Sequence, residues 1–200
     1  LGLTTRKMLI LNGLAKKVQP YIESNNYYEK IVNNSVSSTT LTEYYCKGDK
    51  AVLSLNTTIK ATGETRKLIN YYEGEKTNTY METGENKIAL LNTLGVPSKI
   101  MIIGIDFNDN LWHLFQMAAT SSIKSAEWKG KECYFINGDW MQETYIEKET
   151  GLMLKRTDGS VTMENGDTSD IVVEFEYEFG KVMDENLIEP NREEYEIQKN

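Results

Sequence analysis

The stretch Trp128-Lys-Gly-Lys-Glu-Cys-Tyr-Phe-Ile136, followed by Glu143-Thr-Tyr-Ile-Glu-Lys-Glu-Thr-Gly-Leu-Met-Leu-Lys-Arg156, decides the fold of this chain. It reads as consecutive strands joined by tight turns, in which Gly130 and Gly151 supply the positive φ angles that such turns need. Consecutive strands of this kind form a β-meander. A long meander of antiparallel strands tends to form one strongly curved sheet, whose concave side is filled by helices, by a ligand or by both. The stretch therefore predicts a container.

Length and charge narrow the classes of protein. The 200 residues suit a single domain over 1–200. With 22 Lys and Arg against 30 Asp and Glu, the net charge is -8. This charge repels a phosphate backbone and disfavours adsorption to an anionic membrane, although a lipid anchor overrides the second effect. We therefore expect no nucleic-acid partner, and membrane association only through an anchor upstream of residue 1.

Hydropathy and the first residue of the chain bear on its location. No apolar run approaches the roughly 18 to 20 residues that span a bilayer. The chain begins at Leu1 without an initiator Met, which we interpret as a leader that was trimmed away or not included. Whatever address such a leader carried is missing from the sequence.

The N-terminal part, residues 5–34, is predicted to be helical. Leu11, Leu14, Ala15 and Val18 recur at helical spacing, which favours an amphipathic helix near 5–19. Pro20 should end or kink this helix. A second helical piece is then expected to continue to about residue 34.

A first meander is predicted over 39–91. Strand patterns alternate there with four turns that contain Gly48, Gly63, Gly74 and Gly84, so four or five strands fit. One face of the strand at 53–59 should point to the core. That face consists of Leu53, Leu55, Thr57 and Ile59.

A crossing helix is predicted over 106–119, between the two meanders. An apolar stripe covers one side of it, and Asp106, Asn108 or Asp109 can accept its first free backbone N–H groups. The stripe consists of Phe107, Leu111, Leu114, Phe115, Ala118 and Ala119. The preceding segment, Ile100 to Ile105, fits a buried strand and the start of a helix equally well.

The second meander is predicted over 123–180, followed by an irregular tail over 181–200. Its clearest strand places Val173, Phe175, Tyr177 and Phe179 on one face and three glutamates on the other. In the tail, Leu187 and Ile188 are expected to pack back onto the sheet.

Catalytic and metal sites are poorly supported. His113 is the only histidine, and we expect it to be an exposed helix residue. Carboxylate pairs such as Glu147 and Glu149 fit glycosidic chemistry in principle, but such rows are more often solvated strand faces. Asp106-x-Asn108-x-Asn110 begins like a calcium loop and then lacks its Gly and its bidentate Glu. We therefore predict neither an enzyme nor a metal or cofactor.

The two cysteines, Cys46 and Cys133, form no Cys-x-x-Cys pair, so zinc and thioredoxin-like chemistry are disfavoured. Both lie in predicted strands. They are a candidate disulfide in an oxidising compartment, and two buried thiols are the alternative.

The order of helix, meander, crossing helix and second meander, with the two phrases quoted above and a closing Glu-Phe-Glu-Tyr strand, resembles the LolA/LolB-like lipoprotein-carrier superfamily. The resemblance covers roughly Leu11 to Pro190. It implies an α+β fold, in which a strongly curved antiparallel sheet forms an incomplete barrel with helices packed on its concave side. In the carriers an apolar cavity accepts lipid acyl chains and an arginine latches the helical lid. Arg66 matches no phrase for that arginine, so no functional residue is carried over.

The sequence thus predicts a non-enzymatic extracytoplasmic binding or carrier domain, anchored as a lipoprotein to the outer face of the cell membrane. Its ligand would be a lipid, the acyl chain of a lipoprotein or another apolar molecule held in the concavity of the sheet. The 12 Tyr and 8 Met suit such a cavity. The alternative is an interaction or sensor module of a cell-surface lipoprotein with a filled core and no ligand. The predicted ligand-lining residues are Leu53, Leu55, Ile59, Leu111, Phe115, Phe175 and Tyr177.

Overall fold

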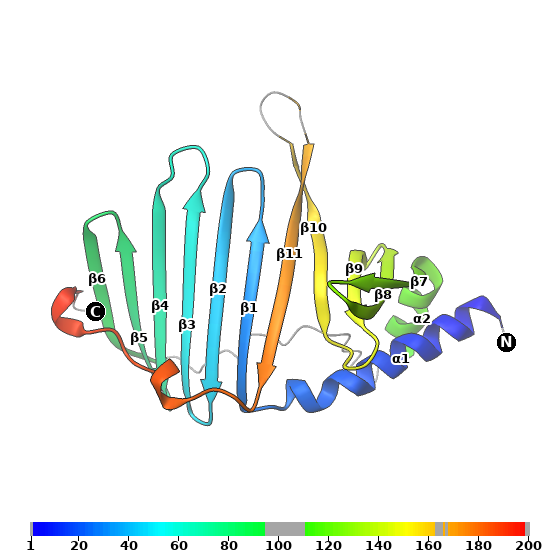
Figure 1. The fold of residues 1–200 in the computed structure, drawn as a ribbon, viewed down its shortest axis with the longest axis horizontal. Helices are drawn as coiled ribbons and strands as arrows, with labels where there is room; N and C mark the ends of the chain where they lie inside the picture. The colour runs from blue at the N-terminus through cyan, green and yellow to red at the C-terminus, as the bar shows by residue number, and fades with distance from the viewer. Residues whose placement is uncertain (1, 95–110, 163–165, 167, 199–200) are drawn as a thin grey trace. The chain divides into compact units, whose positions relative to one another are not determined.

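A computed structural model describes residues 2–94, 111–162, 166 and 168–198. Over these residues the chain is an α+β protein built from an open sheet and two α-helices (Figure 1). The elements are α1 (Leu3–Ile22), β1 (Asn26–Asn34), β2 (Ser38–Lys47), β3 (Lys50–Ile59), β4 (Thr65–Glu73), β5 (Lys76–Thr83), β6 (Asn86–Leu94), α2 (Leu111–Thr120), β7 (Ser122–Trp128), β8 (Lys131–Gly138), β9 (Met141–Glu147), β10 (Met153–Thr162), β11 (Thr168–Phe179), the 3-10 turns η1 (Asp184–Asn186) and η2 (Arg192–Glu194), and β12 (Glu196–Gln198).

The strand order is β12-β6-β5-β4-β3-β2-β1-β11-β10-β9-β8-β7. Both predicted meanders are confirmed. Consecutive strands pair antiparallel from β1 to β6, and they do so again from β7 to β11. The short β12 instead pairs parallel with β6. No described helix is long and apolar enough to cross a membrane.

The chain divides into two compact units, where the sequence predicted a single domain. Unit 1 comprises Leu1–Glu23 and Ile102–Phe175, and unit 2 comprises Ser24–Met101 and Glu176–Asn200. Each unit buries a hydrophobic cluster of its own. Composition and length do not reveal this division, because it depends on which side chains meet in space.

In unit 1, both helices pack against the strands β8 and β9. The buried cluster consists of Leu11, Leu14, Leu114, Ala118, Ile136 and Ile146. Gly151 lies against α1: a Cβ atom there would come within 2.4 Å of the Leu14 carbonyl oxygen. Its φ of +74° also requires glycine.

The prediction for the N-terminal part is right for the first helix and wrong for the second. α1 runs through Pro20 to Ile22, with Leu11, Leu14 and Val18 buried. Residues 26–34 form the strand β1 instead of a helical piece. All nine of them pair with β2, and the cross-strand pairing outweighs the helical spacing of the apolar residues.

The first meander contains five strands, from β2 to β6, and β1 precedes them as a sixth. The four predicted turns are confirmed. Gly48, Gly63, Gly74 and Gly84 all adopt positive φ angles of 59° to 70°, which only glycine adopts without strain. Local turn chemistry therefore fixes this part of the topology.

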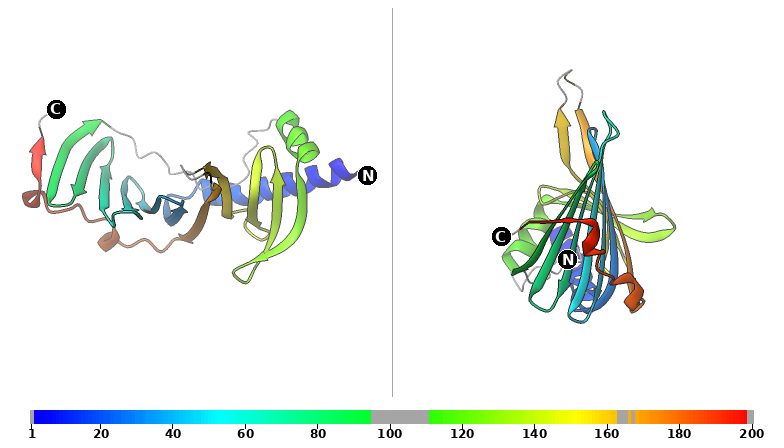
Figure 2. Two further views of the ribbon diagram at one scale, coloured as in Figure 1. Left: turned by 90° about the horizontal axis from the view of Figure 1, so that it is seen from above. Right: turned by 90° about the vertical axis from the view of Figure 1, so that its left-hand side faces the viewer.

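In unit 2, the C-terminal tail covers one face of the strands. Val182, Leu187 and Tyr195 pack on this surface, which we call the tail-covered face; its own side chains are Tyr28, Tyr45, Val52, Ile69, Tyr71, Tyr80 and Ala89. Figure 2 follows the tail, coloured orange to red, across these strands to β12.

Glu189 fastens the tail to β5. Its carboxylate accepts hydrogen bonds from the Tyr80 hydroxyl and from the Asn78 amide, and it pairs with Arg192 at 3.0 Å. Leu187 is buried as predicted, whereas Ile188 is 69% exposed. The tail is therefore more ordered than predicted, with only one of the two expected apolar anchors.

The crossing helix is described from Leu111 onward, and residues 106–110, with their predicted N-cap, lie outside the described residues, as do Ile100 to Ile105. Of the six stripe residues, Leu114 and Ala118 are buried, Ala119 is exposed, and Phe107 lies outside the described residues. Leu111 is 73% exposed and Phe115 is 43% exposed. The buried stripe of α2 is therefore narrower than the sequence predicts.

β11 alternates as predicted. Val173 and Phe175 are buried, while Glu176 and Glu178 are exposed. Glu174 and Glu176 pair with Lys129 and Lys30 at 2.6 and 3.2 Å. The glutamate row is thus a solvated face with structural ion pairs.

Candidate functional site

The other face of the unit 2 sheet carries a continuous apolar row. Cross-strand register places Leu55 of β3 opposite Leu68 of β4, Leu68 opposite Met81 of β5, and Met81 opposite Ile88 of β6. Directly opposed residues share one face of a sheet. We call this surface, with Leu53, the leucine face. Four strands at about 4.8 Å spacing give the row a length of about 14 Å.

The side chains of the leucine face are half-buried. Three of the predicted ligand-lining residues, Leu53, Leu55 and Ile59, lie on this face. They occupy alternate positions of β3, and all three have intermediate exposure. The fully buried residues of β3 are instead Ala51 and Val52 at its start. The alternation predicted for β3 is therefore present, but its apolar residues are half-buried and do not belong to the fully buried core.

A buried carboxyl group lies on the same face. Glu29 of β1 is opposite Tyr44 of β2, and Tyr44 is opposite Leu53 of β3. The Glu29 side chain is 0% exposed, and neither of its oxygen atoms has a hydrogen-bond partner among the described residues. Burial raises the pKa of this carboxyl from 4.5 to about 8. Glu29 is consequently a neutral acid near pH 7, because no cation offsets the cost of burying its charge.

The neighbours of Glu29 are aromatic. The Tyr27 and Tyr44 rings lie 5.6 Å apart, tilted by 48°. Burial raises the pKa of both hydroxyls above the ordinary tyrosine value. The Tyr44 hydroxyl is buried and makes no hydrogen bond of ordinary geometry to a described residue.

The remaining predicted lining residues are divided between the units. Phe175 is buried at the end of unit 1, and Tyr177, which is half-buried, lies in the unit 2 part of β11. Leu111 and Phe115 belong to unit 1 and face solvent. The β3 residues of the predicted set therefore lie beside the apolar row, and Tyr177 shares a face of β11 with Phe179, whose ring is 6.3 Å from that of Tyr27.

Exposed aromatic side chains form a separate patch in unit 1. Trp112 and Phe115 stack with ring centroids 5.7 Å apart, and His113 lies 6.0 Å from Trp140. Trp112 and Trp140 are both more than half exposed. His113 is an exposed helix residue, as predicted.

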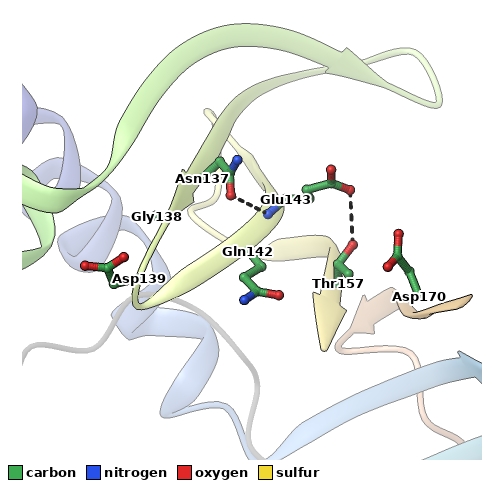
Figure 3. Close-up of a pocket in the computed structure, with 7 residues that line it drawn as sticks. All are labelled: Asn137, Gly138, Asp139, Gln142, Glu143, Thr157 and Asp170. Atoms are coloured by element: carbon green, nitrogen blue, oxygen red, sulfur yellow. Dashed lines mark hydrogen bonds between the residues drawn. The ribbon is translucent and has the colours of Figure 1, made fainter. Parts of the chain in front are cut away.

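An open polar pocket lies between the β8–β9 turn and the strands β10 and β11 (Figure 3). It has a volume of about 410 Å³. Within it the Thr157 hydroxyl donates to Glu143 at 3.3 Å, and the Glu143 amide donates to Asn137 at 3.4 Å. The lining residues are Asn137, Gly138, Asp139, Gln142, Glu143, Thr157 and Asp170.

The carboxylates of this pocket do not converge on one point. Asp139 lies on the opposite side from Glu143 and Asp170 (Figure 3). Among the described residues no group of three His, Cys, Asp or Glu side chains can hold a metal ion. Glu147, which the sequence paired with Glu149, is held instead by Lys131 at 3.0 Å.

Two further pockets mix polar and apolar linings. One, of about 630 Å³, lies beside the first in unit 1 and includes Trp140, Met153 and Arg156. The other, of about 360 Å³, lies in unit 2 between Tyr28, Tyr45 and Met183. Neither is an enclosed apolar cavity.

The cysteines do not form the predicted disulfide. Both are buried thiols. Cys46 lies on β2, which pairs with β1 and β3, and Cys133 lies on β8, which pairs with β7 and β9. A disulfide requires Cα atoms within about 7 Å, and strands that are not neighbours do not bring two cysteines into such an approach.

Sequence reasoning missed Leu68, Met81, Ile88 and Glu29. The first three were available in principle, because the glycine turns fix the hairpin register and thereby the cross-strand partners. Glu29 was hidden, since its segment was predicted to be helical.

No protein-family model matches the chain, and no curated protein matches its sequence. The class that the structure itself defines is an α+β protein with an open, predominantly antiparallel sheet.

Proposed function

We propose that this protein is a non-enzymatic binding or carrier domain that holds a lipid, the acyl chain of a lipoprotein or another apolar ligand on the leucine face. The observation that carries the proposal is the row Leu55, Leu68, Met81 and Ile88, which is apolar across four strands and half-buried. The opposite face of the same strands is covered by the chain's own tail.

Both faces of the unit 2 sheet carry apolar side chains. An antiparallel sheet of a small protein ordinarily has one apolar and one wet face. Here the tail-covered face already supplies an apolar core, so a second apolar row is not needed to complete it. Each CH₂ group that an acyl chain buries against such a row contributes about 0.8 kcal/mol. Binding along the row therefore gives an apolar ligand a substantial affinity.

The resemblance to the LolA/LolB-like carriers supports the same proposal and extends it. It adds a strongly curved sheet, an incomplete barrel with helices on its concave side, and work outside the cytoplasm as a lipoprotein anchored to the cell membrane. These finer statements rest on the residues quoted for the resemblance, and the open sheet is compatible with them.

Two adjacent substitutions in β3 test the proposal. Leu55→Asp places a charge on the leucine face, whereas Asn56→Asp places one on the opposite face of the same strand. We expect the purified protein to take up the fluorescent probe N-phenyl-1-naphthylamine and to release lipid on solvent extraction. Leu55→Asp should weaken probe uptake by at least about tenfold, because a buried charge is unfavourable, and Asn56→Asp should not.

Absence of both probe uptake and extractable lipid in the unsubstituted protein would overturn the proposal. Equal uptake by both variants would show that a ligand binds elsewhere.

A second candidate, an interaction or sensor module without a ligand, is favoured by the exposed aromatic patch. Trp112, Phe115 and Trp140 are the kind of large exposed side chains that anchor protein interfaces. Replacing Trp112 and Phe115 by Ala should abolish partner binding under this alternative and leave probe uptake unchanged under the first.

A further inference from the structure

The leucine face ends, on its β1 side, in the buried carboxyl of Glu29. Glu29 lies in the cross-strand row beside the apolar one: it is opposite Tyr44, which is opposite Leu53, and it is two residues from Ile31 on the same face of β1. The chain thus places a buried carboxyl group next to an apolar surface. Buried polar groups are nearly always hydrogen-bonded, so one without a partner requires an explanation.

We propose that Glu29, as a neutral acid, donates a hydrogen bond to the carbonyl oxygen of an acyl ester or amide whose hydrocarbon chain lies along the leucine face. This inference rests on the proposed function and names the class of its ligand. The carboxyl is the natural donor, because its two oxygen atoms have no hydrogen-bond partner among the described residues. A protonated carboxyl offers one O–H donor, which an acyl carbonyl satisfies and a pure hydrocarbon does not.

The surroundings favour a neutral ligand group over a charged one. Burial raises the pKa of Glu29 to about 8, with no cation contributing to the shift. The described neighbours of Glu29 on this face, Tyr27 and Tyr44, carry no positive charge that could pair with an anionic headgroup. A cationic headgroup would have to ionise Glu29 and bury both charges, at a high desolvation cost. A carbonyl oxygen needs only a donor.

Access to the carboxyl requires side chains to move. Glu29, Tyr27 and Tyr44 are each at most 1% exposed. The ligand carbonyl therefore reaches Glu29 by displacing a tyrosine ring, and side-chain rotamer changes of this kind are common at binding sites.

Displacement of bound N-phenyl-1-naphthylamine tests the proposal. Methyl dodecanoate and a straight-chain hydrocarbon of matched length compete for the probe on the unsubstituted protein and on three variants. Glu29→Gln keeps a neutral donor, Glu29→Leu removes it, and Glu43→Gln changes a carboxyl on the opposite face of β2.

We expect the ester to bind about tenfold more tightly than the hydrocarbon, the factor that one net hydrogen bond of about 1.4 kcal/mol provides. This preference should persist in Glu29→Gln and Glu43→Gln and disappear in Glu29→Leu. An equal preference in Glu29→Leu, or none in the unsubstituted protein, would overturn the anchor while leaving the proposed function intact. Failure of the probe to bind would overturn the proposed function itself.

A pH series supplies the second measurement, which is decisive if Glu29→Leu fails to fold. The ester preference of the unsubstituted protein should fall as pH rises through about 8, because the ionised carboxyl no longer donates. The preference of Glu29→Gln should not change. The other described titratable groups on this face include Tyr27, Tyr44, Cys46, Tyr72, Arg66 and, on β11, Tyr177 beside Phe179. The unsubstituted protein and Glu29→Gln both retain these groups, so only the Glu29 proton distinguishes their two pH profiles.

Discussion

At the residue scale, the most consequential position is Glu29. A carboxyl group that is 0% exposed and has no hydrogen-bond partner among the described residues is costly to ionise. Its pKa is raised from 4.5 to about 8. Because the folded state keeps a proton that the unfolded state has lost, this group makes stability depend on pH.

The sign of the effect follows from the raised pKa. Between pH 4.5 and 8 the folded chain binds more protons at Glu29 than the unfolded chain, so stability falls as pH rises across this window and levels off above it. The full effect is on the order of 3 to 6 kcal/mol.

Glu29→Gln should therefore remove this loss, and the difference in unfolding free energy between variant and unsubstituted protein should grow from pH 5 to about 8. Urea denaturation at a series of pH values measures the difference. Parallel pH profiles for the two proteins would contradict the prediction.

At the scale of the element, α2 shows how a helix stripe is narrowed by its contacts. Leu114 is 5% exposed within the unit 1 cluster, while Leu111, one turn earlier, is 73% exposed. Both belong to the apolar stripe that the sequence predicts. Only the position of α2 against α1 and the strands β8 and β9 separates them.

Leu114→Ala should lower the free energy of unfolding by about 2 to 5 kcal/mol, because it removes buried methyl groups and leaves a cavity. Leu111→Ala, its matched control, should change it by less than about 0.5 kcal/mol. Chemical denaturation measures both. Equal losses would mean that Leu111 is buried in solution, and two negligible losses would mean that α2 does not pack on unit 1.

At the scale of the whole molecule, the two units have separate hydrophobic clusters. Separate clusters commonly behave as separate cooperative units in native-state hydrogen exchange. In unit 2 the tail takes part in the cluster through Leu187, which is 8% exposed, while the adjacent Ile188 is 69% exposed.

Leu187→Asp should reduce the exchange protection of β2 to β6 without changing that of α1 and α2, because the unpaired charge enters only the unit 2 cluster. Ile188→Asp should leave the protection of both units unchanged. Hydrogen exchange followed by mass spectrometry measures each element. Equal loss of protection in the two units would show that they unfold together.

Local chemistry explains what could be predicted from the sequence. Glycines with positive φ angles lie in the turns that join β2 to β3, β3 to β4, β4 to β5 and β5 to β6, so the hairpins follow from the residues themselves. The alternation of Val173 and Phe175 with glutamates likewise marks β11. Most of the candidate site on β3 was predictable for the same reason, since period two assigns Leu53 and Leu55 to one face.

Turns and periodicity act over a few neighbouring residues, so the two meanders, the first helix and the polar face of β11 follow from the amino-acid sequence alone. The apolar spacing of residues 26–34 fits both a helix and a strand, and the place of β1 between β2 and β11 settles it as a strand. The folded structure also buries Glu29 and puts Cys46 and Cys133 on strands that are not neighbours. These outcomes depend on which strands lie side by side in the sheet, which local propensity does not encode.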